Sequence, residues 1–256
     1  MANSLTFLGT GTSSGIPLIG CSCPVCTSSD SRDQRLRTSA YVQYEGLRLI
    51  IDAGPDYRQQ MIAAGISNPD AILLTHAHMD HIGGLDDIRS FNYLQKRAFP
   101  IYCEDEVEDV LRKVFYYAFD EPKYPGAPDF EMHRIKAGTP FYIHGVEILP
   151  VRIFHGKMPI VGFRFGSLAY LTDVSHIDDE SFALLKGVNL LVVSTVSYKM
   201  HHSHFSVSEA LDAIEKLAPR RAFITHLSHR VGTYTEFSSH LPEGVSVAFD
   251  GLTAEF

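Results

Sequence analysis

Apolar and polar positions along the chain follow two periods, one typical of strands and one typical of helices. We predict strands over the apolar, β-branched or aromatic runs at residues 5–8, 40–44, 47–51 and 71–74. Glu45-Gly46, between two of these runs, indicates a hairpin turn. Helices are predicted over residues 56–64 and 104–119, and Gly65 is placed to end the first of them in a left-handed cap.

The second half of the chain repeats this mixture after a loop rich in proline and glycine at residues 120–129. A β-rich block is predicted over residues 131–173, and helices and strands then alternate over residues 181–186, 190–194, 206–218 and 222–225. Ser206 and Glu209 have the spacing of a capping box, which predicts a helix start. The apolar stripe of this helix, typical of packing against a core, consists of Val207, Ala210, Leu211, Ile214 and Leu217.

Length and composition are those of a globular protein. A chain of 256 residues can bury a large core, and we expect one domain over residues 1–256. Hydrophobic residues make up 45% and charged residues 20%, which excludes a disordered protein. No apolar run approaches the roughly 18 residues of a membrane span, so no membrane association is expected. The segment 1–5 lacks the features of a secretion signal, so a cytoplasmic location is expected.

The charge of the chain narrows the classes of partner. The formal net charge of −8 at pH 7 argues against non-specific attraction to nucleic acid or to an anionic membrane. A small anionic substrate stays compatible with this charge, because bound divalent cations can dominate the local field.

The densest chemical feature is the segment Thr75–His81, which directly follows a predicted strand. His76, His78, Asp80 and His81 provide three imidazoles and a carboxylate within six positions. These ligand types suit zinc, manganese and iron, and a strand that ends in a tight loop can direct them around two neighbouring ions. A single histidine here would be interpreted as a hydrogen-bonded loop residue, but the spacing H-x-H-x-D-H indicates a metal site.

This spacing resembles the signature loop of the metallo-β-lactamase superfamily, and the resemblance extends across nearly the whole chain. It implies an α/β (α+β) fold, the four-layer αββα sandwich, and a two-metal site completed by later residues. The candidates for these residues each follow an apolar run, and they are His155, Asp173 and His226. The ligand set that the resemblance implies is His76, His78 and His155 on one ion, Asp80, His81 and His226 on the other, and Asp173 shared.

Three of the four cysteines, Cys21, Cys23 and Cys26, lie within six residues. In a chain expected to be cytosolic, this crowding favours a metal over disulfides. A tetrahedral zinc site needs a fourth ligand, and His229 is the candidate. The alternative is that these cysteines are reduced and buried as small apolar side chains, which is how we interpret the isolated Cys103.

The spacing C-x-C-x-x-C, together with residues 8–17, resembles the phosphoribosyl 1,2-cyclic phosphate phosphodiesterase branch of the superfamily, known from bacterial phosphonate degradation. This resemblance implies a structural zinc beside an active site with two divalent ions, manganese or zinc. It also implies a phosphodiesterase acting on a small cyclic ribose phosphodiester, and it leaves a homodimer open. The glycines of residues 8–17 lack the Gly-Lys-Ser/Thr ending of a phosphate loop, so we interpret them as turns around the metal site.

A second histidine cluster, at residues 199–204, offers a proton donor for the alkoxide that leaves phosphorus. His204 is the first candidate, since it precedes the capped helix as the acid histidine does in related phosphodiesterases, and His202 is the second. Histidine suits this role because its pKa lies near neutral pH. The alternative is that the cluster only decorates an exposed loop. Asp80 is assigned both as a metal ligand and as a catalytic residue.

Asp52, in Asp52-Ala53-Gly54, resembles the D-x-G element of the superfamily. The resemblance implies that this aspartate supports the metal-binding loop without binding metal itself. Support of this kind typically changes affinity or activity about 10-fold or more. The alternative is an aspartate that lies on the surface or caps a turn.

Other activities of the superfamily remain open. The metal site alone also fits a tRNA 3′-processing endonuclease or a lactone or thioester hydrolase. The acidic charge and the lack of a basic tRNA-binding insertion disfavour the first, and the cysteine cluster disfavours the second. A non-catalytic binding protein similar to the pyrroloquinoline quinone biosynthesis protein shares a comparable cysteine cluster, but the complete set of active-site donors favours catalysis.

Overall fold

Two seven-stranded sheets form the centre of the computed structural model, which describes residues 2–256 and leaves Met1 outside. The first sheet contains, in spatial order, β14 (Thr253–Glu255), β1 (Ser4–Gly9), β2 (Ser39–Tyr44), β3 (Leu47–Ile51), β4 (Ala71–Leu73), β5 (Phe99–Cys103) and β6 (Phe130–Arg134). The second contains, in spatial order, β13 (Val245–Val247), β12 (Arg221–Thr225), β11 (Leu190–Ser194), β10 (Leu168–Leu171), β9 (Met158–Phe165), β8 (Val146–His155) and β7 (Phe141–Ile143).

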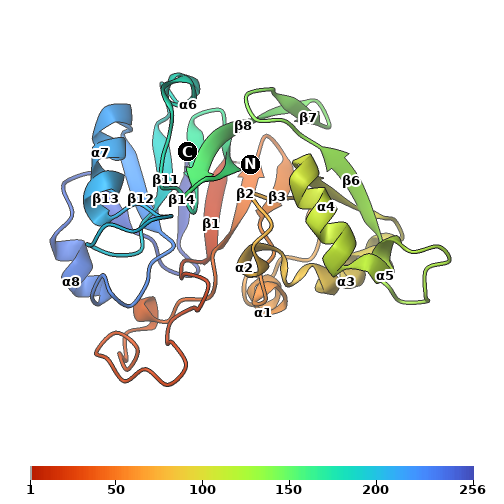
Figure 1. The fold of residues 1–256 in the computed structure, drawn as a ribbon, viewed down its shortest axis with the longest axis horizontal. Coiled ribbons are helices and arrows are strands. Elements are labelled where there is room, and N and C mark those ends of the chain that lie inside the picture. Colours follow the sequence, from red (N-terminus) through yellow and green to blue (C-terminus); the bar gives the residue numbers. More distant parts are fainter. Residues whose placement is uncertain (1) are drawn as a thin grey trace.

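Helices cover the outer side of each sheet (Figure 1). Beside the first sheet lie α1 (Tyr57–Ala63), α2 (Met79–Ile82), α3 (Arg89–Gln95), α4 (Asp105–Val114) and α5 (Tyr116–Phe119). Beside the second lie α6 (Asp179–Leu184), α7 (Val207–Leu217) and α8 (Tyr234–Ser239). None of the helices in the described residues has both the length and the apolar character that crossing a bilayer requires. The layers confirm the predicted αββα sandwich of α/β class.

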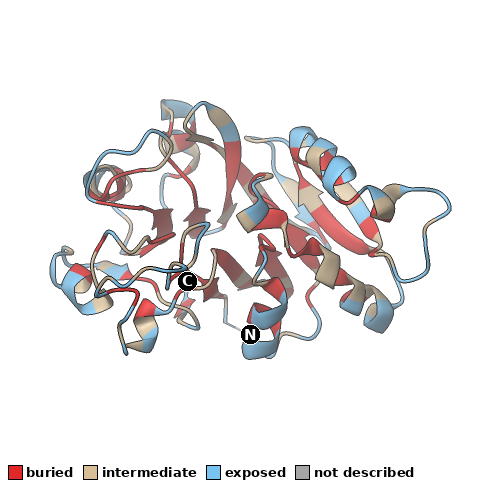
Figure 2. Cartoon of the chain, turned by 60° about the horizontal axis from the view of Figure 1, so that its bottom comes forward, coloured by how far each residue is buried: buried red, intermediate tan, exposed pale blue. Residues whose placement is uncertain are grey.

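Three apolar layers hold the sandwich together, and Figure 2 shows the strands buried and the outward sides of the helices exposed. Between the two sheets pack Phe7, Leu49 and Phe163, all with no exposed surface. A second layer joins the first sheet to its helices, and a third joins the second sheet to α6, α7 and α8. Each large apolar side chain buried in this way contributes about 1.5–3 kcal/mol relative to exposure.

Most local predictions are confirmed. Tyr44 pairs with Leu47 across the predicted hairpin, and Gly65 has the left-handed φ of 64° expected after α1. The capping box at α7 is present, because Ser206 accepts from the N–H of Glu209 and the carboxylate of Glu209 accepts in return from the N–H of Ser206. Cys103 is fully buried in β5, as expected for a core residue.

The predicted helix over residues 104–119 is interrupted in the structure. Phe115 leaves the helical conformation, with φ −107° and ψ 37°, and separates α4 from α5. The cause is aromatic packing, since Phe115 and Phe119 both lie against Phe130 of β6, with ring centroids 6.1 and 5.6 Å away. Tertiary contacts therefore override a continuous helical pattern here.

Candidate metal centre

The first four donors come from the turn that follows β4. His78 is the N-cap residue of α2, so the chain passes from an extended segment into a helical turn between His76 and His81. His76 and His81 are buried, Asp80 is half-buried and His78 is exposed. The ring centroid of His76 lies 4.6 Å from that of His78 and 4.1 Å from that of His81. The turn thus brings together the four side chains that the sequence pattern singled out.

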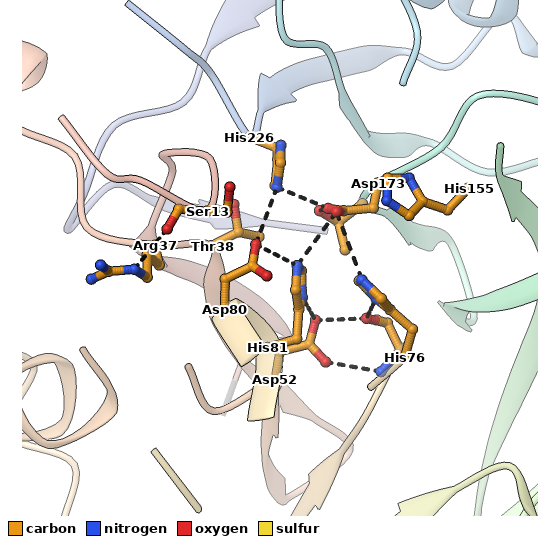
Figure 3. A network of polar contacts seen from close by, with 12 residues as sticks. Ser13, Arg37, Thr38, Asp52, His76, Asp80, His81, His155, Asp173 and His226 are labelled. Carbon is orange, nitrogen blue, oxygen red and sulfur yellow. Dashed lines mark hydrogen bonds and ion pairs between the residues drawn. The ribbon is translucent and has the colours of Figure 1, made fainter. Parts of the chain in front are cut away.

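The three later donors each follow a strand of the second sheet. His155 is the last residue of β8, Asp173 comes two residues after β10, and His226 comes directly after β12. Because β10, β11 and β12 run parallel, their carboxyl ends meet at one edge of the sheet. Asp173 and His226 both have a left-handed φ of 56°, so the backbone turns sharply at each strand end. Figure 3 shows these two side chains pointing toward each other.

The seven side chains form two groups that share Asp173, and Figure 3 labels six of them, all except His78. The ligand atoms of each group lie within 4.8 Å of one another, and the groups are His76, His78, His155 and Asp173, and Asp80, His81, Asp173 and His226. Oδ1 of Asp173 lies 3.0 Å from Nε2 of His226. Oδ2 of Asp173 lies 3.5 Å from Nε2 of His81 and 3.8 Å from Nε2 of His76. One carboxylate therefore faces both groups.

Several nitrogens that face this carboxylate have no hydrogen-bond partner among residues 2–256. They are Nε2 of His76, His81 and His226, and all three residues are buried. Buried polar atoms are nearly always paired in folded proteins, so a concentration of unpaired nitrogens indicates a missing partner. Imidazole nitrogens and carboxylate oxygens are ligands of divalent ions such as zinc and manganese, which fit this donor set.

The histidines around Asp173 set the charge balance of the centre. Burial opposes ionisation of Asp173, yet the adjacent His226 and His81 hold the pKa of its carboxyl well below the usual range. Burial lowers the pKa of His76 and of His226, so both imidazoles are neutral and able to bind an ion. Although burial acts in the same direction on His81, Asp173 and Asp52 raise its pKa well above the usual range. A proton on His81 then compensates the buried carboxylates, a role that a cation can take over.

Asp52 lies behind the donor turn and is fully buried. Its Oδ1 accepts a hydrogen bond from the N–H of Thr75 at 2.8 Å, and its Oδ2 accepts one from the Thr75 hydroxyl at 2.8 Å. Oδ2 also lies 2.7 Å from Nδ1 of His81. When a cation replaces the extra proton and the imidazole is neutral, this last contact keeps the remaining proton on Nδ1 and leaves Nε2, which faces Asp173, free to bind the ion.

Gly54 completes the D-x-G element by allowing a close approach. A Cβ at this position would lie 1.9 Å from the carbonyl oxygen of Asp80, which no side chain can tolerate. The backbone that carries Asp52 therefore packs directly against the backbone that carries Asp80. This contact positions the donor turn from a second side.

The second histidine cluster places one ring beside the donor groups. The ring centroid of His204 lies 4.5 Å from that of His155 and 5.1 Å from that of His226. Burial lowers the pKa of His204 to about 3. His202 is exposed, and its ring lies against His201, 4.4 Å away between centroids. His204 is thus next to the donors, while His202 lies on the outer side of the cluster.

Two contacts of this loop were not predicted. Nδ1 of His155 donates to the carbonyl oxygen of Ser203 at 2.6 Å, which leaves Nε2 of His155 for the donor group. His201, which the sequence did not single out, lines a pocket together with His204. No local sequence pattern indicates either contact, because the loop at residues 199–204 approaches β8 only in the folded chain.

The cysteine cluster forms a third group of donors. Nδ1 of His229 lies 3.3, 3.4 and 3.6 Å from the sulfur atoms of Cys21, Cys23 and Cys26, respectively. A tetrahedral zinc ion with ordinary bond lengths separates a sulfur and a nitrogen ligand by about 3.5 Å. A hydrogen bond from the backbone of Cys26 lowers the pKa of the Cys23 thiol to about 6, which favours the thiolate. The four side chains therefore fit a single tetrahedral ion.

Comparison with known proteins places the chain in a family. Residues 47–227 match the model of the beta-lactamase superfamily domain. A crystal structure described as a new diphosphatase from the PhnP family is similar over 99% of this chain and 98% of its own, with a TM-score of 0.91 and 42% identity. Zinc-bound PqqB from Methylobacterium extorquens shares the fold, with a TM-score of 0.77 and 20% identity over 99% of this chain and 100% of its own.

A curated relative differs in length. An octanoyltransferase of Porphyromonas gingivalis is 39% identical over 96% of this chain, but the match covers 50% of that protein. The chain spans about half the length of such curated relatives or less. Because the family model covers most of the chain and the PhnP-family structure matches it nearly end to end, the chain belongs to the metallo-β-lactamase superfamily and is of the PhnP type.

Proposed function

We propose that this chain is a metal-dependent phosphodiesterase that cleaves a small cyclic ribose phosphodiester. The observation that carries the proposal is the pair of donor groups joined by Asp173, with donors of the kind that two divalent ions require. The 42% identity to a diphosphatase of the PhnP family, over 99% of the chain, supports phosphate chemistry for this site.

The proposed ligands divide as the geometry groups them. His76, His78 and His155 would hold one ion, Asp80, His81 and His226 would hold the other, and Asp173 would serve both. The mixture of nitrogen and oxygen donors suits manganese or zinc. When bound, two such ions act as Lewis acids on a phosphate and lower the pKa of water near neutral. Asp52 keeps the proton of His81 on Nδ1, and Ser203 does the same for His155.

His204 is the proposed proton donor to the leaving alkoxide. It lies beside both donor groups, and its Nδ1 is buried without a hydrogen-bond partner in residues 2–256. A phosphate anion next to this ring favours the protonated imidazole, opposing the effect of burial. His202 is the reserve candidate, since its ring contacts that of His201 and lies on the outer side of the histidine cluster. Asp80 is assigned to both binding and catalysis because its half-buried carboxylate lies 3.4 Å from Nε2 of His81.

The cysteine group is proposed to hold a structural zinc. Cys21, Cys23, Cys26 and His229 supply four ligands and leave no open position for a substrate, which is typical of a structural rather than a catalytic site. The ion would join the loop at residues 18–26 to the segment after β12. Three bound ions per chain are therefore expected, one for each cysteine or histidine group.

The proposed substrate is a small molecule. The net charge of −8 disfavours nucleic acid as a partner, which separates this chain from a tRNA-processing enzyme. A lactone or thioester hydrolase would use the same donors, so the substrate class needs a direct test. A homodimer is compatible with the proposal and is not required by it.

The test combines elemental analysis with a substrate screen. The purified protein is assayed on an activated phosphodiester, a cyclic ribose phosphate and a lactone, with added manganese or zinc and with a chelator. We expect three ions per chain and hydrolysis of the phosphodiesters only, abolished by the chelator. Asp173→Asn should lose both active-site ions and all activity. Cleavage of the lactone alone, or a single ion held at the cysteines with no hydrolysis, would overturn the proposal.

A further inference from the structure

The two sheets end in four edge strands, and β6 is the longest of them. It contains five residues, whereas β7, β13 and β14 contain three residues each. Natural proteins keep exposed edges short, because an edge presents unpaired backbone groups to other chains. Figure 1 shows β6 at the outer end of the first sheet. An edge of this length is a place where a further strand can add.

The backbone groups of β6 face two directions. The carbonyl oxygen of Asp129 accepts from β5 at 2.8 Å, and the N–H of Ile135 donates to β5 at 3.0 Å, so both positions face the sheet. Because backbone groups alternate between the two sides of a strand, Glu131 and His133 face β5 as well. The remaining N–H and C=O groups point outward without a hydrogen bond to another residue of the described chain, and they belong to Phe130, Met132 and Arg134.

A hollow of about 620 Å³ lies along this edge. Its walls include Tyr102, whose ring stacks on His133 with centroids 4.5 Å apart, and Glu108, which accepts from Nε of Arg134 at 2.8 Å. His133 and Arg134 are consecutive residues of a strand, so their side chains lie on opposite faces of β6. The hollow therefore borders both faces, and residues 2–256 leave the edge between them uncovered.

The edge is also held in a fixed position from its inner side. The side chain of Asn92 brackets the residue before β6, since it donates to the carbonyl oxygen of Asp129 at 2.8 Å and accepts from its N–H at 2.9 Å. At the other end, the buried Glu108 holds Arg134. A strand fixed in this way loses little freedom when it pairs with another strand.

The sequence of β6 is complementary to itself when two copies run antiparallel. If they pair about Met132, Glu131 lies opposite the partner's His133. Within the chain, Oε1 of Glu131 already lies 3.1 Å from Nε2 of its own His133. Two carboxylates and two imidazoles would then alternate across the interface, an arrangement that stabilises an antiparallel pair.

The same register satisfies the backbone. Met132 meets the partner's Met132, and Phe130 meets the partner's Arg134, so the residues with outward groups face one another. Each such pair exchanges two hydrogen bonds, and the three pairs form about six. Glu131 and the partner's His133 fall at the intervening position, where opposite side chains come closest. Sliding one strand by two residues would instead set Glu131 against itself or His133 against itself, which selects a single register.

We propose that two copies of this chain associate edge to edge through β6, antiparallel about Met132, so that their first sheets form one continuous sheet. The partner is a second copy because the edge complements its own sequence, as a two-fold interface requires. This assembly does not depend on the proposed reaction, and its tests use no activity.

The first test is sedimentation velocity of the metal-loaded protein over a range of concentrations. We expect a particle of twice the chain mass of 28.5 kDa. Glu131→His and His133→Glu each set two side chains of the same kind against each other, and each should weaken dimerisation about 5- to 30-fold. The double variant exchanges the two residues and should restore the dimer. Glu243→His, beside the edge strand β13, is the matched control and should leave the dimer unchanged.

The second test is covalent. The proposed axis sets the two Cα atoms of residue 132 about 5.5 Å apart, within the range that a disulfide bridges. Diamide should therefore oxidise the two thiols of a Met132→Cys dimer to a disulfide and be reduced to its hydrazine. Glu131→Cys is the control, because its two copies would lie about 8 Å apart, beyond that range.

Three results would overturn the proposal. One is a protein that stays monomeric at every concentration. Another is a dimer that neither single charge variant weakens, which would place the interface elsewhere. The third is a disulfide-linked dimer that forms as readily from Glu131→Cys as from Met132→Cys.

Discussion

Replacing Asp52 by asparagine tests how the donor turn is held. Three donors converge on this carboxylate, namely the N–H and the hydroxyl of Thr75 and the Nδ1–H of His81. Asparagine keeps the shape but has a single acceptor oxygen, so its NH2 group must face at least one of these donors. If the NH2 group takes the place of Oδ2, His81 must carry its proton on Nε2, the atom that faces Asp173.

Either orientation of the asparagine weakens metal binding. A proton on Nε2 of His81 removes a ligand atom, whereas the other orientation sets the NH2 group against the N–H of Thr75. A buried donor without an acceptor costs about 1–3 kcal/mol. Loss of a carboxylate that supports a metal ligand typically weakens binding about 10- to 100-fold, or about 1.4–2.7 kcal/mol. We expect an effect of this size on the active-site ions and none on the ion at the cysteines.

The assay is a metal titration against a competing chelator, followed by hydrolysis at increasing metal concentration. In Asp52→Asn, activity should return at high metal concentration, with a half-saturating concentration about 10- to 100-fold higher than in the unaltered protein. Asp70→Asn is the matched control, since Asp70, just before β4, accepts from the N–H of Arg48 at 2.8 Å and belongs to none of the three metal-donor groups found in the described residues. Unaltered metal affinity in Asp52→Asn, or an equal loss in Asp70→Asn, would refute the reasoning.

His204→Ala should keep its ions but lose about 10²- to 10⁴-fold in kcat on esters whose leaving group needs a proton. The loss should be much smaller on a p-nitrophenyl ester, whose leaving group is stable as an anion. Equal losses on both esters would exclude His204 as the proton donor. Cys23→Ala should lower the ion count from three to two and Tm by about 5 °C or more, whereas Cys103→Ala should keep all three ions in elemental analysis. The metal-free protein should lose stability as pH falls from 6.5 toward 3. In that window the unfolded chain protonates His204, whereas burial lowers the pKa in the folded protein to about 3, so this residue contributes a slope of at most about 1.4 kcal/mol per pH unit. Urea unfolding at pH 7 and pH 5 measures the slope, and a His204→Gln protein that is equally sensitive to acid would contradict the assignment.

Local pattern was sufficient for the elements that carry their own signals. The hairpin at Glu45-Gly46 and the capping box at Ser206 both follow from residues close together in sequence. Helix α8 has the same kind of local signal, a capping box between Thr233 and Glu236. The three-residue strand β14 has none, because its place beside β1 depends on residues about 250 positions away.

The metal donors also divide into residues that a local sequence pattern indicates and residues that it does not. H-x-H-x-D-H and the cysteine spacing are short patterns, and the resemblance to a superfamily extended them to His155, Asp173 and His226. The structure brings all of these into compact groups. The contact of Ser203 with His155 and the close approach of Gly54 to Asp80 could not be predicted from the sequence. Each contact joins two segments that come together only when the chain folds.

The backbone is left-handed at Asp52, Asp173 and His226, three residues that hold or support the metal donors. Such a conformation costs a residue other than glycine about 1–3 kcal/mol, and the surrounding fold must impose it. The cage is therefore shaped before any ion arrives, and loading it requires little rearrangement of the chain. Which ion the cage carries should then depend on how well its nitrogen and oxygen donors suit each cation and on the supply of that cation in the surroundings.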